Sequence, residues 1–342
     1  MRKYSFKNDY SELAHPRILS ALSEAAGAQL EGYGLDEISF KAGGLIKTMV
    51  NSPSADVHFV SGGTQANLIA ISSALRPHEA VIACESGHIS LHEAGAIEAS
   101  GHKICAVEGH NGKLRPGDIE SVVRFHADEH MVKPRLVFVS QSTEVGTVYT
   151  KAELSAVSEY CRDNGLYLYL DGARLGAGIN SPACDLTYGG VAALTDMFYI
   201  GGTKNGALFG EAIVIPSDEL KADFRFHLKQ KGAMLAKGAA IGAQFAALMD
   251  GGLYDRLAAR AGRAALELAA GIAELGYEFL YPAQTNQIFP VFPEQTAEKL
   301  HNLYDFYDWS KTNGMTAVRL VVSWAAPENI IGEFLNDLAG MK

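Results

Sequence analysis

The stretch LYLYLDGAR, residues 166–174, together with MFYIGGTKNG, residues 197–206, decides the fold of this chain. Each stretch opens on an apolar run and ends abruptly in small and polar residues. We interpret both runs as buried strands of an open α/β sheet, in which ligands bind at the carboxyl ends of the strands. Asp171 then ends one strand, and Lys204 follows the end of the next. The sequence therefore predicts a carboxylate and an amine at one ligand-binding edge.

This pair suits pyridoxal 5'-phosphate (PLP), because a lysine can form a Schiff base with its aldehyde while an acid pairs with its pyridinium nitrogen. Each residue alone also has a plainer interpretation. An Asp-Gly pair after a strand is typical of a turn, and a lysine in a Gly-rich loop is usually solvated. The conjunction favours the cofactor, since the small residues around Lys204 let the backbone pass close to a ligand.

Composition narrows the class of protein. The length of 342 residues predicts a large domain over residues 1–250 and a smaller α+β domain over residues 251–342. A net charge of −10 argues against nucleic acid as the main partner. The four cysteines have no CxxC spacing, so we expect reduced thiols and no metal site. Without an apolar signal region or a membrane-length apolar run, we expect a cytoplasmic protein with no membrane partner.

Strand and helix patterns alternate from residue 56 onward, which indicates a mostly parallel sheet of the seven-stranded type between helices. A single helix is expected over residues 88–100, and the long helix over residues 253–275 is expected to bridge to the second domain. The predicted strands of the large domain cover residues 56–60, 80–84, 103–107, 135–140, 166–170, 197–200 and 211–215.

The sequence SGGT at residues 61–64 ends one predicted strand and opens a helix. Free backbone amides at a helix N-terminus favour an anion, so a phosphate could bind there, although a plain turn capped by Thr64 fits equally. His88 begins a later helix and could stack on a planar cofactor or be an ordinary surface or core residue. His92 and Glu93 are expected to be ordinary helix residues.

Four segments in this order resemble the threonine aldolase family, fold-type-I PLP enzymes that are grouped with the β-eliminating lyases. They are SGGTQAN at 61–67, SGH at 86–88, LDGARL at 170–175 and GTKNG at 202–206. The resemblance covers nearly the whole chain, and the DGAR segment with its downstream lysine is its most specific part. It implies a fold-type-I α/β architecture with PLP as the cofactor.

The resemblance also implies roles for individual residues. Glu144 stands where many family members carry a histidine. The lysine loop also lacks the Ser-Lys-Gly form of many relatives. Both differences leave open which residue acts as the catalytic base. The implied cofactor-binding residues are Gly62, Gly63 and Thr64 around the phosphate, His88 stacked on the ring, Asp171 at the pyridine nitrogen, Arg174, Lys204 at the aldehyde, and Lys231. The predicted catalytic set is Lys204, His88, Asp171 and Glu144, and the predicted substrate-binding set is Ser11, Tyr33, Arg174 and Arg319.

The implied activity is aldol cleavage of L-threonine, L-allo-threonine or a related β-hydroxy-α-amino acid to glycine and an aldehyde. The base could be His88, Glu144 or a bound water. β-Elimination, transamination and racemisation remain alternatives, because the same cofactor apparatus serves them, and a non-catalytic binding protein is a further one. The resemblance also implies a homodimer or homotetramer whose active site lies at the subunit interface, with Tyr33 and Lys231 near the partner's phosphate.

Overall fold

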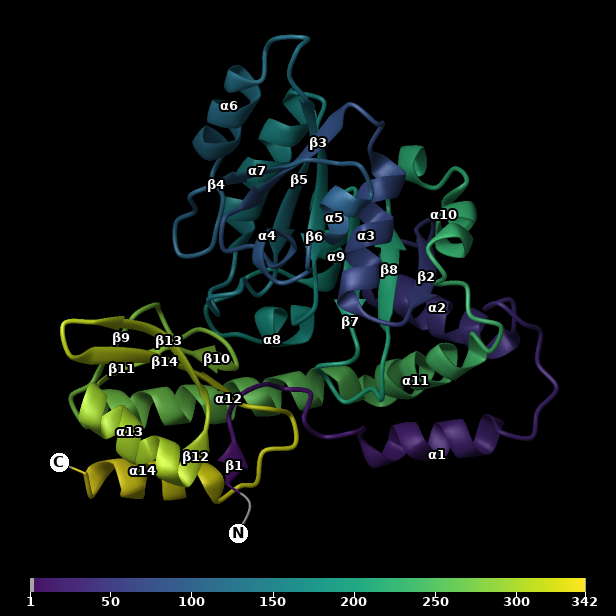
Figure 1. Cartoon of the computed structure of the whole chain (residues 1–342). Helices are drawn as coiled ribbons and strands as arrows, with labels where there is room; N and C mark the ends of the chain where they lie inside the picture. The colour runs from purple at the N-terminus through teal and green to yellow at the C-terminus, as the bar shows by residue number, and fades with distance from the viewer. Residues whose placement is uncertain (1–2, 342) are drawn as a thin grey trace.

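A seven-stranded sheet forms the centre of the larger part of the chain in the computed structural model, which describes residues 3–341 (Figure 1). Strand β8 runs in the opposite direction to the other six strands, and the remaining pairings are parallel, which confirms the predicted mostly parallel sheet. The strands follow the order β2 (Asp56–Val60), β8 (Glu211–Ile215), β7 (Met197–Gly201), β6 (Tyr167–Asp171), β5 (Lys133–Ser140), β3 (Glu79–Cys84) and β4 (Ile104–Val107).

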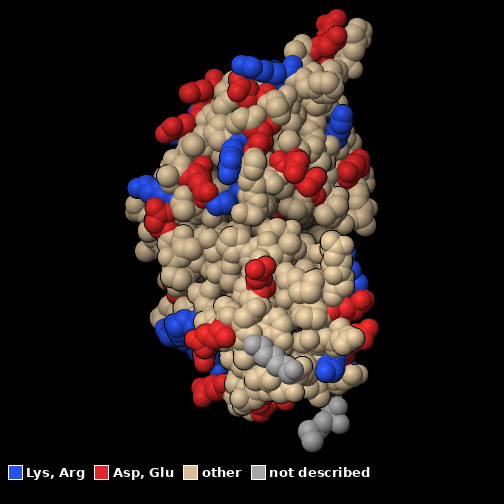
Figure 2. Space-filling view, turned by 90° about the vertical axis from the view of Figure 1, so that its left-hand side faces the viewer, with Lys and Arg blue, Asp and Glu red and all other residues tan. Residues whose placement is uncertain are grey.

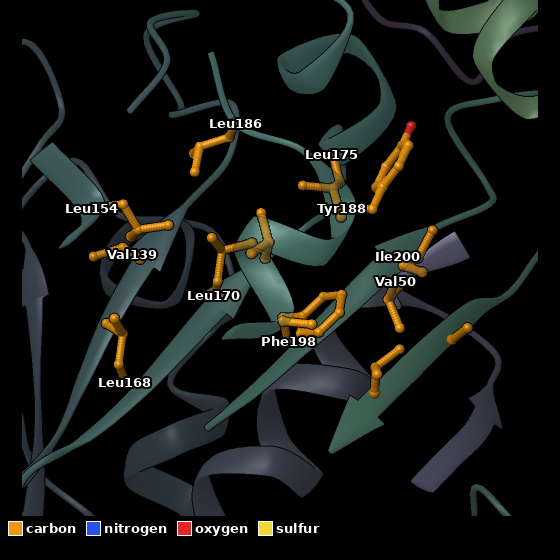
Figure 3. Packing of buried hydrophobic residues seen from close by; sticks show 14 of the residues in the cluster. Val50, Val139, Leu154, Leu168, Leu170, Leu175, Leu186, Tyr188, Phe198 and Ile200 are labelled. Atoms are coloured by element: carbon orange, nitrogen blue, oxygen red, sulfur yellow. The ribbon is translucent and has the colours of Figure 1, made fainter. Parts of the chain in front are cut away.

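Successive side chains of the central strands enter two different cores, because residues of a strand point alternately to opposite faces of the sheet. Leu170 and Phe198 belong to the first core, with Leu154 and Val139 nearby (Figure 3). Tyr169 and Tyr199 belong to the second. The first core is covered by α2 (Glu37–Met49), α6 (Pro116–Phe125), α7 (Lys151–Asp163), α9 (Tyr188–Leu194) and α11 (Ala239–Met249), with α1 (Pro16–Ala25) packed on α11. The second is covered by α3 (Gly63–Ala74), α4 (His88–Leu91), α5 (Ala96–Ala99) and α10 (Phe224–Gln230).

A third core lies in the C-terminal part of the chain, below the large sheet in Figure 1. Its helices are α12 (Leu253–Glu274), α13 (Glu294–Leu303) and α14 (Ile330–Ala339), and its strands are β9 (Glu278–Phe279), β10 (Gln287–Ile288), β11 (Pro290–Pro293), β12 (Tyr304–Asp305), β13 (Tyr307–Thr312) and β14 (Met315–Val321). The N-terminal strand β1 (Tyr4–Ser5) pairs with β12, and Phe6 is buried in this same core. The first residues therefore pack with the C-terminal part, while the domain boundary at residue 250 stays a prediction.

The expected single helix over residues 88–100 is wrong. The chain turns between α4 and α5, where Ala94 and Gly95 adopt φ values of 51° and 73°. Such left-handed backbone interrupts an α-helix, and glycine tolerates it at little cost. The turn brings Glu93 into the interior, where its side chain is buried.

The described residues 3–341 contain no helix that is both long and apolar enough to span a membrane. Acidic and basic side chains are interspersed on the face drawn in Figure 2, which carries no continuous basic track. Within the same described range, no group of three or more His, Cys, Asp and Glu side chains is arranged to hold a metal ion. All four cysteines are free thiols.

Candidate active site

Asp171 ends strand β6 with its side chain only 4% exposed. Three donors reach its carboxylate: Tyr199 Oη at 2.6 Å, Ala173 N at 2.9 Å and Asn67 Nδ2 at 3.0 Å. An ionised carboxylate offers about four acceptor sites, so one further donor can be accommodated. A protonated ring nitrogen fits this requirement.

Lys204 follows β7 in a tight turn and faces a cavity in the same region. Burial, and next the Arg174 guanidinium, lower the pKa of its amine, while Asp9, Asp171 and Glu211 act in the opposite direction. A lysine whose amine is partly deprotonated is a better nucleophile than a solvated one. The sequence predicted Lys204 at a ligand-binding edge, and in the structure it lines a cavity and has a lowered amine pKa.

Glu211, which sequence reasoning missed, anchors the turn before Lys204. Its Oε2 accepts from Gly202 N at 2.8 Å, and its Oε1 accepts from Thr203 Oγ1 at 2.8 Å. The register of the sheet explains this contact, because Glu211 opens β8 directly opposite Gly201 at the end of β7. Burial raises the pKa of the Glu211 carboxyl to about 7.

His88 lies at the start of α4 and lines the same cavity. Its Nδ1 is 2.8 Å from Oε1 of the buried Glu93, which also accepts from Asn67 Nδ2 at 2.7 Å. The expectation that Glu93 is an ordinary helix residue is therefore wrong. Asn67 connects Glu93 to Asp171, so a continuous hydrogen-bonded path joins the histidine to the acid at the strand end.

Glu144 follows β5 and is a half-buried wall of the cavity. Its Oε1 accepts from Ser140 Oγ at 2.7 Å and from the backbone N–H of His88 at 2.9 Å. Burial, and next the charge of Asp171, raise the pKa of the Glu144 carboxyl. This side chain thus holds the first turn of α4 in place and contacts the cavity.

The two arginines predicted to bind a carboxylate face this cavity from different parts of the chain. Arg174 is already paired with the buried Asp9, which comes from the N-terminal arm. Arg319 Nη2 donates to Lys7 O at 3.2 Å, and its guanidinium carbon lies 5.3 Å from the ring centre of Tyr307. Arg319 Nε is buried and has no partner among residues 3–341.

A cavity of about 480 Å³ brings together His88, Glu144, Arg174, Lys204 and Arg319, and this volume is typical of a small-molecule site. Its walls come from the N-terminal arm, the large sheet and the C-terminal part of the chain. The lining residues are Tyr10, His88, His92, Glu144, Arg174, Lys204, Gln287, Tyr307, Asp308, Trp309 and Arg319.

The predicted phosphate site lies at the start of α3. Gly62 is the N-cap residue and makes no side-chain cap, while Gly63 and Thr64 begin the helix. A Cβ on Gly63 would lie 3.0 Å from the Tyr199 hydroxyl, so glycine allows this helix end to approach β7 closely. The first-turn amides of α3 are thus available for an anion near the strand ends.

Of the predicted residues, His88, Glu144, Arg174, Lys204 and Arg319 line the cavity, whereas Asp171, Gly62, Gly63 and Thr64 do not. Lys231, Tyr33 and Ser11 do not line it either. Lys231 lies near α3 of its own chain, because Gln65 Nε2 donates to Lys231 O at 3.3 Å. Tyr33 is 45% exposed, and Lys229 Nζ lies 4.8 Å from its ring centre. The hydroxyl of Ser11 donates to Asn8 Oδ1 at 3.0 Å on the surface.

Sequence reasoning missed Asp9, Asn67, Glu93 and Glu211 as site residues. A weak signal existed for Asn67, since it is a polar residue at a position where the helix pattern expects an apolar one. Nothing local marks Asp9, because its role depends on Arg174, which is 165 residues away. Asn67 likewise meets Asp171 from 104 residues away, whereas Glu93 and Glu211 contact residues that are near in sequence but lie across a turn.

Known proteins share this architecture along the whole chain. The beta-eliminating lyase family model matches residues 17–295. The low specificity L-threonine aldolase of Pseudomonas sp. (strain NCIMB 10558) is 32% identical over 97% of this chain and 95% of its own. The solved structure of Leishmania major threonine aldolase superposes with a TM-score of 0.97 at 47% identity, covering 99% of both chains.

A more distant likeness concerns the fold alone. The aspartate aminotransferase of Thermus thermophilus superposes with a TM-score of 0.73 at 15% identity, covering 99% of this chain and 92% of its own. It confirms the predicted fold-type-I architecture. The match of the family model and the near-full-length relatives show that the chain belongs to the beta-eliminating lyase family and is a PLP-dependent lyase of the threonine aldolase type.

Proposed function

We propose that this protein binds PLP in the cavity and cleaves a β-hydroxy-α-amino acid, such as L-threonine or L-allo-threonine, to glycine and an aldehyde. One observation carries the proposal: the desolvated amine of Lys204 and two arginine side chains, Arg174 and Arg319, face one cavity of small-molecule size. The threonine aldolase relatives support the choice of reaction.

The side chains around the cavity fit the cofactor. Asp171 would hold the ring nitrogen, Lys204 would take the aldehyde, His88 would stack on the ring, and the start of α3 with Gly62, Gly63 and Thr64 would hold the phosphate. When bound there, PLP supplies an electron sink for the bond that breaks at Cα. The buried Asp171 carboxylate favours a protonated ring nitrogen, which strengthens that sink.

The two arginines would share the substrate carboxylate unequally. Arg174 already donates from Nε and Nη2 to Asp9, so Nη1 is the nitrogen of its guanidinium that the ion pair with Asp9 does not use. Arg319 has a buried Nε without a partner among residues 3–341 and uses Nη2 for a backbone carbonyl. We therefore assign the main grip on the substrate carboxylate to Arg319, with Arg174 as a positive neighbour. A guanidinium fork suits a carboxylate because its donors match the two oxygens.

A base has to accept the proton of the β-hydroxyl group as the Cα–Cβ bond breaks. His88 and Glu144 both face the cavity. Burial and the charge of Asp171 raise the pKa of the Glu144 carboxyl, and one of its oxygens already accepts two hydrogen bonds. The Nδ1 atom of His88 is occupied by Glu93, and its side chain is 35% exposed and lines the cavity.

Product analysis tests the reaction. Purified protein with PLP should convert L-threonine or L-allo-threonine to glycine and acetaldehyde, whereas β-elimination of a hydroxy amino acid would give a keto acid and ammonia. Borohydride reduction should attach the cofactor to Lys204, and Lys204→Ala should lose both this label and the cleavage activity. Lys237→Ala, in a loop away from the cavity walls, is the matched control. Recovery of the label on another lysine would refute the assignment of Lys204.

We also infer that the active enzyme is a homodimer or homotetramer in the cytoplasm. The exposed ring of Tyr33 and the basic segment Lys229–Lys231 support a shared interface, since neither contributes to the cavity of its own chain. The four free thiols support a reducing compartment.

A further inference from the structure

Glu93 is a buried carboxylate directly behind His88. It lies in the turn between α4 and α5 and is 6% exposed. Its Oε1 is 2.8 Å from His88 Nδ1 and 2.7 Å from Asn67 Nδ2, while its Oε2 is buried without a partner among residues 3–341. A buried carboxylate is costly to desolvate, so its contact with His88 needs an explanation beyond packing.

We propose that Glu93 is a positioning residue that fixes His88 as the tautomer protonated at Nδ1, so that Nε2 accepts the β-hydroxyl proton of the substrate. The inference rests on the proposed aldol cleavage and assigns the base that the proposal left open. It makes His88 the catalytic base and Glu93 the residue that orients it.

The Asn67 amide defines which atoms accept in this network. Tyr169 Oη lies 2.9 Å from Asn67 Oδ1, so the phenol donates there and the amide nitrogen points to the two acids. Asn67 Nδ2 then supplies one N–H to Glu93 Oε1 and the other to Asp171 Oδ2. Glu93 Oε1 is therefore an acceptor, and the hydrogen it shares with the imidazole belongs to Nδ1. A neutral imidazole with hydrogen on Nδ1 has its lone pair on Nε2.

The surroundings of His88 leave Nε2 as the free acceptor. Within the described residues, Nε2 makes no hydrogen bond with protein, whereas Glu144 is engaged with Ser140 and with the backbone of His88. His92 is the nearest titratable ring, at 5.6 Å between ring centres, and burial followed by the charge of His88 lowers its pKa. The other charged cavity walls are Arg174, Lys204, Asp308 and Arg319.

The proton transfer balances without another reactant. The β-hydroxyl proton moves to His88 Nε2, and the former O–H pair becomes the second bond of the aldehyde carbonyl as the Cα–Cβ bond breaks. The Cα–Cβ electron pair stays on the Cα side, where one proton is later taken up to give glycine. His88 becomes an imidazolium for this interval, and the Glu93 carboxylate at 2.8 Å stabilises that charge.

Steady-state kinetics of the PLP-loaded Glu93→Gln variant test the catalytic side. Its amide can donate to Nδ1 and so favours the opposite tautomer. We expect kcat on L-threonine to fall by about 10²-fold or more, with KM and cofactor absorbance near the parent's. Glu93→Asp should recover part of kcat, and the acid limb of the kcat–pH profile should shift in both variants. Glu98→Gln, an exposed glutamate on α5, is the matched control and should behave like the parent.

Histidine-selective ¹⁵N NMR tests the tautomer without relying on turnover. In the cofactor-free parent, the neutral imidazole of His88 should be protonated at Nδ1, and in Glu93→Gln it should be protonated at Nε2. An Nε2-protonated His88 in the parent would overturn the proposal, and so would a kcat within about twofold of the parent in Glu93→Gln. If Glu93→Gln fails to fold, the parent spectrum and Glu93→Asp decide. If the parent releases no glycine from any β-hydroxy amino acid, the proposed function fails, while the spectrum still reports the tautomer.

Discussion

Asp9 and Arg174 form a two-pronged ion pair between the N-terminal arm and the end of β6. Arg174 Nε lies 2.7 Å from Asp9 Oδ2, and Nη2 lies 3.0 Å from Oδ1. Asn286 Nδ2 donates to the same Oδ2 at 2.9 Å. Although burial opposes ionisation, Arg174 holds the pKa of the Asp9 carboxyl below its usual value. The arm is therefore part of the site, because it sets which edge of Arg174 faces the cavity.

Asp9→Asn should raise KM for the substrate by about tenfold and lower the thermal unfolding midpoint. The reason is that an amide cannot neutralise the buried guanidinium, and breaking a buried pair is costly. Cofactor absorbance should stay as in the parent. Asp305→Asn removes a long, half-exposed ion pair with Lys7 and serves as the control. Parental KM and stability in Asp9→Asn would show that Arg174 does not depend on the arm.

Asp171→Asn should keep the cofactor bound but reduce kcat by about 10²-fold or more. The carboxylate is preorganised by three donors, and an amide in its place carries no charge to hold a ring nitrogen protonated. Absorbance spectra report cofactor binding, and steady-state kinetics report turnover. Asp185→Asn, away from the cavity walls, is the control. A kcat within about twofold of the parent's would show that Asp171 does not hold the ring nitrogen protonated during turnover.

Arg319→Lys should raise KM and also lower kcat, because one ammonium cannot hold a carboxylate by two parallel hydrogen bonds and the Cα–Cβ bond is then misoriented. Arg319→Ala should be more severe in both constants. Kinetics on L-threonine and L-allo-threonine measure the effect, and Arg263→Lys on the exposed side of α12 is the matched control. Parental constants in both Arg319 variants would eliminate the carboxylate role.

Glu211 should make the stability of the protein depend on pH between its ordinary pKa of 4.5 and its raised pKa of about 7. The folded state binds this proton more tightly than the unfolded state. The stabilisation is therefore complete below pH 4.5 and is lost as the pH rises through 7. Glu211→Gln lacks this loss, so its unfolding free energy relative to the parent should increase over that window by at most about 3 kcal/mol.

Urea unfolding at several pH values measures this difference, with the exposed Glu31→Gln as the control. The cost of replacing one acceptor of the lysine turn is the same at every pH, so only the pH-dependent part reports the titration. A difference between Glu211→Gln and the parent that stays constant from pH 4.5 to 7 would contradict the raised pKa.

A shared active site predicts complementation between two inactive variants. Lys204→Ala removes the amine, and Lys231→Ala should weaken phosphate binding in the partner's site if Lys231 reaches across the interface. Mixed dimers then contain one intact site, so random mixing should restore about a quarter of the parental activity. Light scattering on the parent checks the assembly. A fully active monomer, or the absence of any recovery on mixing, would contradict the interface.

The sequence by itself determined the sheet and its ligand-binding edge. The alternation of side chains along a strand is a local property. The runs at residues 166–170 and 197–200 therefore show which side chains point to each face of the sheet, without knowledge of the neighbouring strands or helices. A residue that follows such a run lies at the carboxyl edge wherever the helices pack. For this reason Asp171 and Lys204 could be identified from sequence.

Tertiary structure alone decided what surrounds these two residues. The Ala94–Gly95 turn breaks a segment whose pattern suits a helix, and the break places Glu93 behind His88. Asp9 meets Arg174 only because β1 pairs with β12 and draws the arm past the cavity. A buried polar side chain takes its role from the donor or acceptor that reaches it, and only the folded backbone brings that partner within hydrogen-bonding distance.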